Sequence, residues 1–110
     1  MGKVEEYLGL AAKAGKVAAG RTAVEKALWR GRGYLVLLTR ECGRDVQRRF
    51  RGLAERFGVP VAPVDGDLGR AIGMPGKVVA VLTDPNLARQ VLLNIDKDRL
   101  ERAIPLATPD

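Results

Sequence analysis

The stretch from Lys16 to Arg32 reads KVAAGRTAVEKALWRGR, a short apolar segment followed by a glycine and by apolar residues at helical spacing. This pattern predicts a strand, a turn at Gly20 and a helix that begins at Thr22. Gly31 or Gly33 would end the helix, because glycine readily adopts the left-handed backbone that follows many helix ends. A strand joined directly to a helix is the building unit of α/β folds.

One face of this predicted helix is basic. Thr22, Lys26 and Arg30 stand four residues apart and therefore share a face. The N-terminus of the helix, with its free N–H groups and positive dipole end, lies beside Arg21, and such an end attracts anions. In a chain of net charge +6, we expect that anion to be a nucleic-acid phosphate.

The same residues also have a structural interpretation. Thr22 and Glu25 form the T-x-x-E pattern of a capping box, which by itself accounts for both side chains, although Thr22 could cap the helix and still touch a ligand. Lys26 could simply lie on a solvated helix face. Trp29 falls off the apolar stripe and is either a partly covered packing residue or a surface that stacks on a partner.

The excess positive charge is uneven along the 110-residue chain. Residues 1–83 hold 15 Lys and Arg against 8 Asp and Glu, whereas residues 84–110 hold 4 against 5. We therefore expect the binding surface to lie before Asp84 and the remainder to close the fold. The 46% of hydrophobic residues supports a packed globule rather than a disordered binder.

The rest of the chain alternates between helical and strand patterns. Asp65 or Asp67 would cap the helix over residues 68–73. Asp84 would cap the last helix, with Pro85 in its first position. Pro60 and Pro63 confine the strand over residues 59–64 to an edge of the sheet. We expect further helices over residues 4–14, 44–57, 68–73 and from 85 onward, and further strands over residues 34–39, 59–64 (the edge strand) and 77–83.

This order predicts an α/β fold with one domain over residues 1–110. The expected architecture is a three-layer α-β-α sandwich with a mixed, mostly parallel four-stranded sheet. Ligands of such sheets bind where the strands end and the loops begin.

The helix expected over residues 44–57 is rich in arginine. Arginine suits bidentate phosphate contacts, but such a row is also typical of a solvated amphipathic helix. We favour the solvated face, with a secondary role in steering a polyanion. The arginines are Arg44, Arg48 and Arg51 on one stripe, Arg49 and Arg56 beside it, and Arg40 before the helix.

A glycine-rich segment follows, but its spacing matches neither common phosphate-loop pattern. Its tip, Gly73-Met74-Pro75-Gly76, is apolar and has little to pack on within its own loop. Bare apolar tips are disfavoured in water, so this one predicts a contact surface.

The sequence lacks the histidine and cysteine sets on which many catalytic and metal sites depend. The chain has no histidine, and its one cysteine, Cys42, therefore lacks an imidazole partner and cannot form an internal disulfide. We expect no catalytic residue, metal or cofactor. The N-terminus lacks a signal-peptide layout and no apolar run approaches a membrane span, which favours a cytoplasmic protein without membrane contact.

The chain resembles the ribosomal protein L-seven-Ae/L-thirty-e superfamily, and most of all its small bacterial members. The resemblance runs from Tyr7 to about Ala88 and is carried by the segments GLAAKAGKVAAG, VEKALWRG, LVLLT, GVPV, LGRAIG and VVAVLTD. It implies a three-layer α-β-α fold that binds RNA, often a kink-turn. The start of the second helix would enter the widened major groove beside sheared G·A pairs, and a hydrophobic loop would cover a flipped-out nucleotide.

Position by position, the resemblance assigns RNA contacts to the family glycine at Gly20, the family lysine at Lys26 and the hydrophobic loop Gly73, Met74 and Pro75. Kink-turn binders usually carry Asn then Glu where this chain has Thr22 and Ala23. The Thr22 hydroxyl can still bond a base edge, but Ala23 cannot accept from a guanine amino group. The loss of this contact predicts weaker selectivity for a kink-turn, since each good base contact is worth about 1–3 kcal/mol of discrimination.

The sequence thus predicts a non-catalytic, monomeric, ribosomal-protein-like module for structured RNA, either kink-turn-like or ribosomal, with no small-molecule substrate. A protein–protein adaptor in ribosome or transcription assembly, using the Trp29 face, is one alternative. A recognition domain that partners an RNA-modifying enzyme is another. The predicted RNA-binding residues are Gly20, Arg21, Thr22, Lys26, Arg30, Gly73, Met74 and Pro75.

Overall fold

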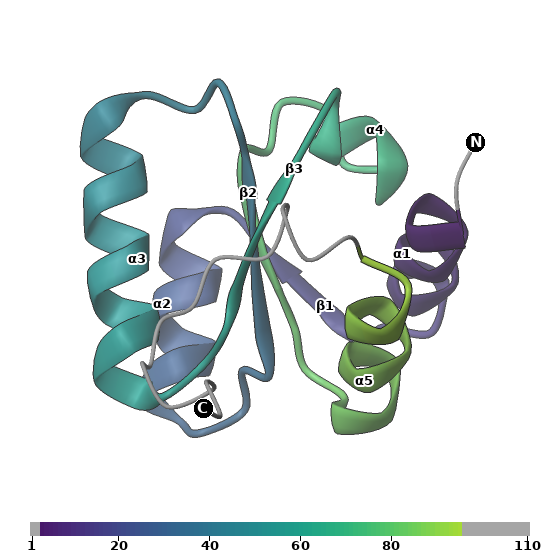
Figure 1. Cartoon of the computed structure of the whole chain (residues 1–110), viewed down its shortest axis with the longest axis horizontal. Helices are drawn as coiled ribbons and strands as arrows, with labels where there is room; N and C mark the ends of the chain where they lie inside the picture. Colours follow the sequence, from purple (N-terminus) through teal and green to yellow (C-terminus); the bar gives the residue numbers. More distant parts are fainter. Residues whose placement is uncertain (1–2, 96–110) are drawn as a thin grey trace, which may run out of the picture.

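A four-stranded sheet with helices on both faces forms the protein, and the computed structural model describes residues 3–95 (Figure 1). Helices α2 and α3 cover one face, and α1, α4 and α5 lie on the other (Figure 1). The elements are α1 (Lys3–Lys13), β1 (Val17–Ala19), α2 (Arg21–Trp29), β2 (Leu35–Thr39), α3 (Arg44–Phe57), β3 (Val61–Val64), α4 (Leu68–Ala71), β4 (Val79–Leu82) and α5 (Pro85–Leu93).

The predicted fold class, helices on both sides of a mixed four-stranded sheet, is confirmed, but the sheet is not mostly parallel. Its strand order is β1-β4-β2-β3, and β4 runs antiparallel to both β1 and β2, while β2 and β3 are parallel. The β3–β4 connection contains only the four-residue helix α4. The connection, residues 65–78, is long enough for a crossover, but its one helix is short, and β4 runs back antiparallel between β1 and β2.

Local signals place several helix ends as expected. Glycines stand at both ends of α3, and Gly58 has the left-handed φ of 69° that favours glycine. The Asp84 carboxylate accepts from the Leu87 N–H at 3.0 Å, directly before Pro85. Of the two candidate caps for α4, Asp67 accepts from the Arg70 N–H at 3.1 Å.

The predicted capping box in α2 is wrong. The helix begins at Arg21, one residue early, and its N-cap is Gly20, which forms no side-chain cap. Thr22 therefore lies inside the first turn. Glu25 is drawn to the neighbouring helix instead, where its carboxylate pairs with the guanidinium of Arg49 on α3.

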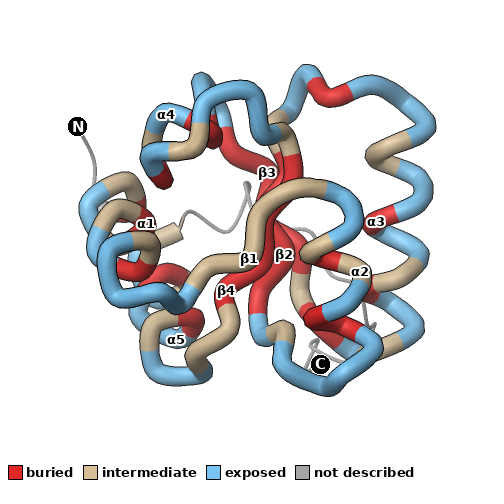
Figure 2. Tube along the Cα trace, turned by 180° about the vertical axis from the view of Figure 1, so that it is seen from behind, coloured by how far each residue is buried: buried red, intermediate tan, exposed pale blue. Residues whose placement is uncertain are grey.

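Two apolar clusters flank the sheet, because successive strand residues point to opposite faces. In β2, Leu35 and Leu37 join the cluster under α1, α4 and α5, whereas Val36 and Leu38 join the one under α2 and α3. Figure 2 shows the resulting centre of buried residues, with the exposed residues at the periphery. None of the helices described within residues 3–95 is both long and apolar enough to cross a membrane.

Candidate functional site

The N-terminus of α2 and the segment before β4 lie against each other at Gly20. This glycine has a φ of 94°, and its N–H donates to the carbonyl of Val79 at 2.9 Å. A Cβ atom placed there would stand 3.3 Å from Nζ of Lys77 and 3.7 Å from its Cδ and Cε. The Lys77 side chain therefore lies along the backbone that opens α2, so the two regions singled out in the sequence form one continuous surface.

The opening turn of α2 is accessible to a ligand. Arg21 and Thr22 are both exposed, and no side chain caps the helix. The first N–H groups of an α-helix have no partner within the helix and carry its positive dipole end. Together with Arg21 and the Lys77 ammonium, they form a cationic surface with several hydrogen-bond donors.

The basic face of α2 continues from this turn. Lys26 and Arg30 are exposed and line a shallow groove of about 470 Å³ between α2 and the start of β1. Neither side chain forms an ion pair with any residue in the described range 3–95. Ala23, where kink-turn binders usually carry Glu, lines the same groove.

The loop that contains Met74 is held close to α4 by a glycine contact. A Cβ atom on Gly69 would stand 2.5 Å from the carbonyl oxygen of Met74 and 3.0 Å from the backbone nitrogens of Gly76 and Lys77. The Met74 N–H donates to the Gly69 carbonyl at 2.7 Å. Only a residue without a side chain allows this approach, so Gly69 sets the path of the loop.

The packing of Met74 corrects the prediction that the loop tip has little to pack on. Met74 is half-buried and packs against the cluster under α1, α4 and α5, so it does not lack packing partners. Gly73, with a φ of 72°, and Pro75 are exposed. The outer surface of the tip is therefore Gly73, Pro75 and Gly76, with only part of Met74 beside them.

Trp29 packs within the fold and also keeps an exposed surface. Its ring contacts the Phe57 ring edge-on at 4.9 Å, and the Arg56 guanidinium lies 4.8 Å from its centroid, yet the residue remains 56% exposed. Trp29 therefore ties the end of α2 to the end of α3 and still presents apolar surface to solvent.

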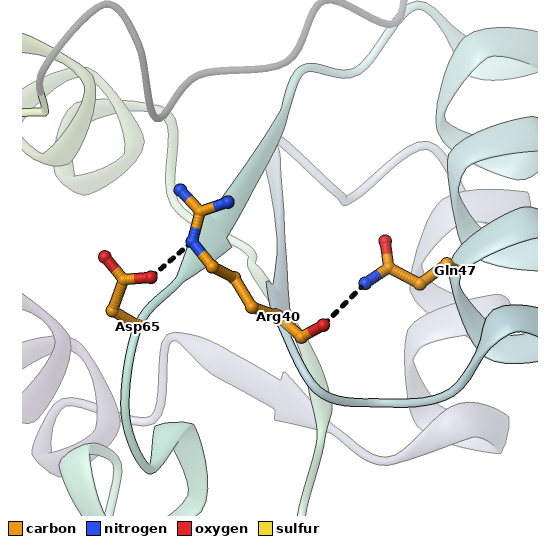
Figure 3. Close-up of polar contacts among 3 residues, drawn as sticks. All are labelled: Arg40, Gln47 and Asp65. Carbon is orange, nitrogen blue, oxygen red and sulfur yellow. Dashed lines mark hydrogen bonds and ion pairs between the residues drawn. The ribbon is translucent and has the colours of Figure 1, made fainter.

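Several of the arginines on and before α3 take part in contacts within the fold. Arg40, at the end of β2, pairs with Asp65 at the end of β3, and Nε2 of Gln47 donates to the Arg40 carbonyl at 3.2 Å (Figure 3). Arg49 pairs with Glu25 across the two helices. These arginines link neighbouring elements, in addition to the solvated role favoured from the sequence.

Among the described residues 3–95, no group of three or more His, Cys, Asp or Glu side chains is placed to hold a metal ion. Cys42 is buried, and its burial raises the pKa of the thiol, which favours the unreactive protonated form.

The sequence did not single out Lys77, which lies against Gly20. It also did not single out Lys16 and Arg32, which line the same groove as Lys26. Lys77 could have been suspected, because it is the first cation after the apolar tip. Lys16 and Arg32 lie outside α2 and share no helical spacing with Lys26, so only the fold brings them together.

Known proteins resemble this chain over most of its length. The profile of the Ribosomal protein L7Ae/L30e/S12e/Gadd45 family matches residues 2–93. The RNA-binding protein YlxQ of Bacillus subtilis (strain 168) is 33% identical over 91 residues, which are 81% of this chain and 91% of that protein.

Two solved structures show the same fold. A protein of unknown function from Bacillus halodurans C superposes with a TM-score of 0.83 at 31% identity, over 88% of this chain and all of that one. A 15.5kD RNA binding protein from Giardia lamblia superposes with a TM-score of 0.67 at 20% identity, over 82% of each chain, which is a likeness of fold. With the family profile matched over residues 2–93 and a relative one-third identical, the chain belongs to the ribosomal protein L7Ae/L30e/S12e/Gadd45 family.

Proposed function

We propose that this protein binds structured RNA through the N-terminus of α2 and the segment 73–77, and that it catalyses no reaction and needs no cofactor. The observation that supports this most is the contact between Lys77 and the backbone of Gly20, which joins an uncapped helix N-terminus, a cation and a loop tip into one surface. The printed name of the Bacillus subtilis relative, an RNA-binding protein, supports the same class of ligand.

In this proposal, each part of the surface takes a different part of the RNA. The open N–H groups of α2, with Arg21, Lys26 and Arg30, hold phosphates. The exposed Thr22 hydroxyl bonds a base edge. Gly73, Pro75 and the accessible part of Met74 pack against an unstacked base or its ribose, as proteins commonly do with single-stranded nucleotides.

The finer proposal concerns which RNA is bound. A kink-turn or a ribosomal RNA element fits the surface, because both offer unstacked bases beside dense phosphates. With Ala23 in place of an acidic residue, we expect a kink-turn to be preferred over a plain internal loop only modestly.

The test is an equilibrium titration of the full chain, as a monomer, against two RNA hairpins. The hairpins are identical except that one contains a kink-turn and the other a plain internal loop. Binding should weaken steeply as salt rises, since each neutralised phosphate releases counterions. Absence of binding to both hairpins at low salt, or affinity that does not change with salt, would contradict the proposal.

A protein–protein adaptor is the second candidate, and the exposed Trp29 ring favours it. Aromatic residues with a neighbouring arginine are enriched at the centres of protein interfaces. Such a protein partner would stay bound when salt is raised but would be lost in a Trp29→Ala variant. RNA would instead be released as salt rises and would still bind the Trp29→Ala variant.

A further inference from the structure

Among the residues that the structure describes, four cations and no acidic side chain line the groove beside Lys26. Lys16 contributes from the residue before β1, Lys26 and Arg30 from α2 and its C-cap, and Arg32 from the loop that follows. All four side chains are exposed. Their convergence over a volume of about 470 Å³ makes a concentrated positive field.

Within residues 3–95, no acidic residue neutralises this cluster. Across residues 3–95, none of the four cations forms a salt bridge, whereas Arg40 and Arg49 elsewhere in the protein each pair with a carboxylate. Mutual repulsion among the four costs free energy, offset in part by the negative dipole end of α2. An unpaired cluster of this kind is expected where an anionic ligand supplies the missing charge.

The backbones that carry the cations outside the helix are fixed. The Lys16 N–H donates to the Ala11 carbonyl at 2.8 Å, and the Lys16 carbonyl accepts from the Thr83 N–H at 2.9 Å. The Arg32 N–H donates to the Ala27 carbonyl at 2.9 Å across Gly31, the left-handed residue of a Schellman motif. The backbone of the groove therefore needs little ordering when a ligand binds, and the cost falls on the cationic side chains.

Apart from Gly15 and Thr83, the lining between the cations is small and apolar. Ala18 comes from β1, and Ala23 and Ala27 come from α2. Alanine lets a bulky backbone approach closely, but it offers no donor or acceptor that would fix one small anion. Four exposed cations over an alanine floor suit a run of phosphates better than a single phosphate group.

We infer that this groove binds the phosphate backbone of an RNA stem that continues from the nucleotides held at the N-terminus of α2. The inference rests on the proposed function and adds a second contact region to it. The nine residues of α2 span about 13 Å at 1.5 Å per residue. A duplex rises about 3 Å per base pair, so a stem of at least about four base pairs is needed to reach the far end of α2.

The test compares two RNAs with the same kink-turn internal loop: in one, the stem beyond the loop has about two base pairs, too few to reach the groove, and in the other it has about twelve, which reach past the groove. The variant is Lys16→Gln/Arg32→Gln in the full chain. The control is Arg44→Gln/Arg48→Gln, which removes the same charge from exposed positions on α3. Thermal melts of both variants verify that the fold is intact.

The wild type should bind the long-stem RNA about tenfold more tightly than the short-stem RNA at moderate salt, as two additional phosphate contacts predict. This gain in affinity should vanish in Lys16→Gln/Arg32→Gln and persist in the α3 control. In Lys16→Gln/Arg32→Gln, the slope of log affinity against log salt concentration should also become shallower by about two.

Equal affinity of the wild type for both lengths, or a gain that survives Lys16→Gln/Arg32→Gln, would overturn the inference while leaving the proposed function intact. An unchanged RNA profile together with loss of an acidic protein partner would assign the groove to that protein and overturn it as well. Failure of the wild type to bind either RNA would instead overturn the proposed function itself.

Discussion

The carbonyl oxygen of Met74 lies 2.5 Å from the point at which a Cβ atom on Gly69 would stand. The opposing atoms are backbone, so they cannot move aside as the end of a flexible side chain would. Gly69 is therefore the residue that allows the segment 73–77 to close over α4 and bring Lys77 against Gly20.

Gly69→Ala should lower the free energy of unfolding by about 1–3 kcal/mol, because the added methyl group overpacks a closed contact. It should also weaken RNA binding, because the loop must shift away from α2. Thermal melts and an RNA titration check both effects.

The matched control for that change is Gly52→Ala, in the middle of α3. A Cβ atom on Gly52 would meet nothing within 4 Å. This substitution should stabilise the protein by about 0.5–1 kcal/mol, since alanine favours a helix interior over glycine. Equal effects of the two substitutions would show that the contact at Gly69 has no special importance.

The sequence predicts the elements better than their pairing. The helix expected over residues 44–57 has those bounds in the structure, because an amphipathic pattern between Gly43 and Gly58 is a local signal. The direction of β4 is not local. It depends on which strands β4 pairs with across the sheet, and β4 pairs antiparallel with both β1 and β2, so the expectation of a mostly parallel sheet was wrong.

The candidate site shows the same division. Glycine and lysine positions along α2 could be assigned from spacing and resemblance. The contact of Glu25 with Arg49, the packing of Met74 and the convergence of Lys16 with Arg32 depend on tertiary structure. A T-x-x-E pattern cannot reveal that a neighbouring helix competes for its glutamate.

Lys26→Ala should weaken RNA affinity by about 1–2 kcal/mol, because a charge-assisted contact to phosphate or guanine is lost. The melting temperature should stay almost constant, since the side chain is exposed and forms no ion pair with residues 3–95. Arg48→Ala, an exposed cation on α3, is the control and should have a smaller effect. Equal losses would mean that net charge alone governs binding.

Ala23→Glu should sharpen the preference for a kink-turn over a plain internal loop by about 1–3 kcal/mol, because a carboxylate can accept from guanine N1 and N2. The same variant should bind the plain loop more weakly, since the new negative charge enters a groove lined by Lys26 and Arg30. The ratio of the two dissociation constants checks the effect. The prediction would be contradicted if the wild type already prefers the kink-turn over the plain loop by several orders of magnitude.

Met74→Ser and Pro75→Ala separate packing from RNA contact at the loop tip. Met74 is half-buried against the apolar cluster, so serine there should cost about 1 kcal/mol of stability as well as RNA affinity. Pro75 is exposed, so alanine there should reduce affinity for structured RNA with little change in melting temperature. Melts and RNA titrations on the same two variants provide the comparison. If Pro75→Ala binds as the wild type does, and Met74→Ser loses affinity only in proportion to its loss of folded protein, the tip serves the core and does not contact RNA.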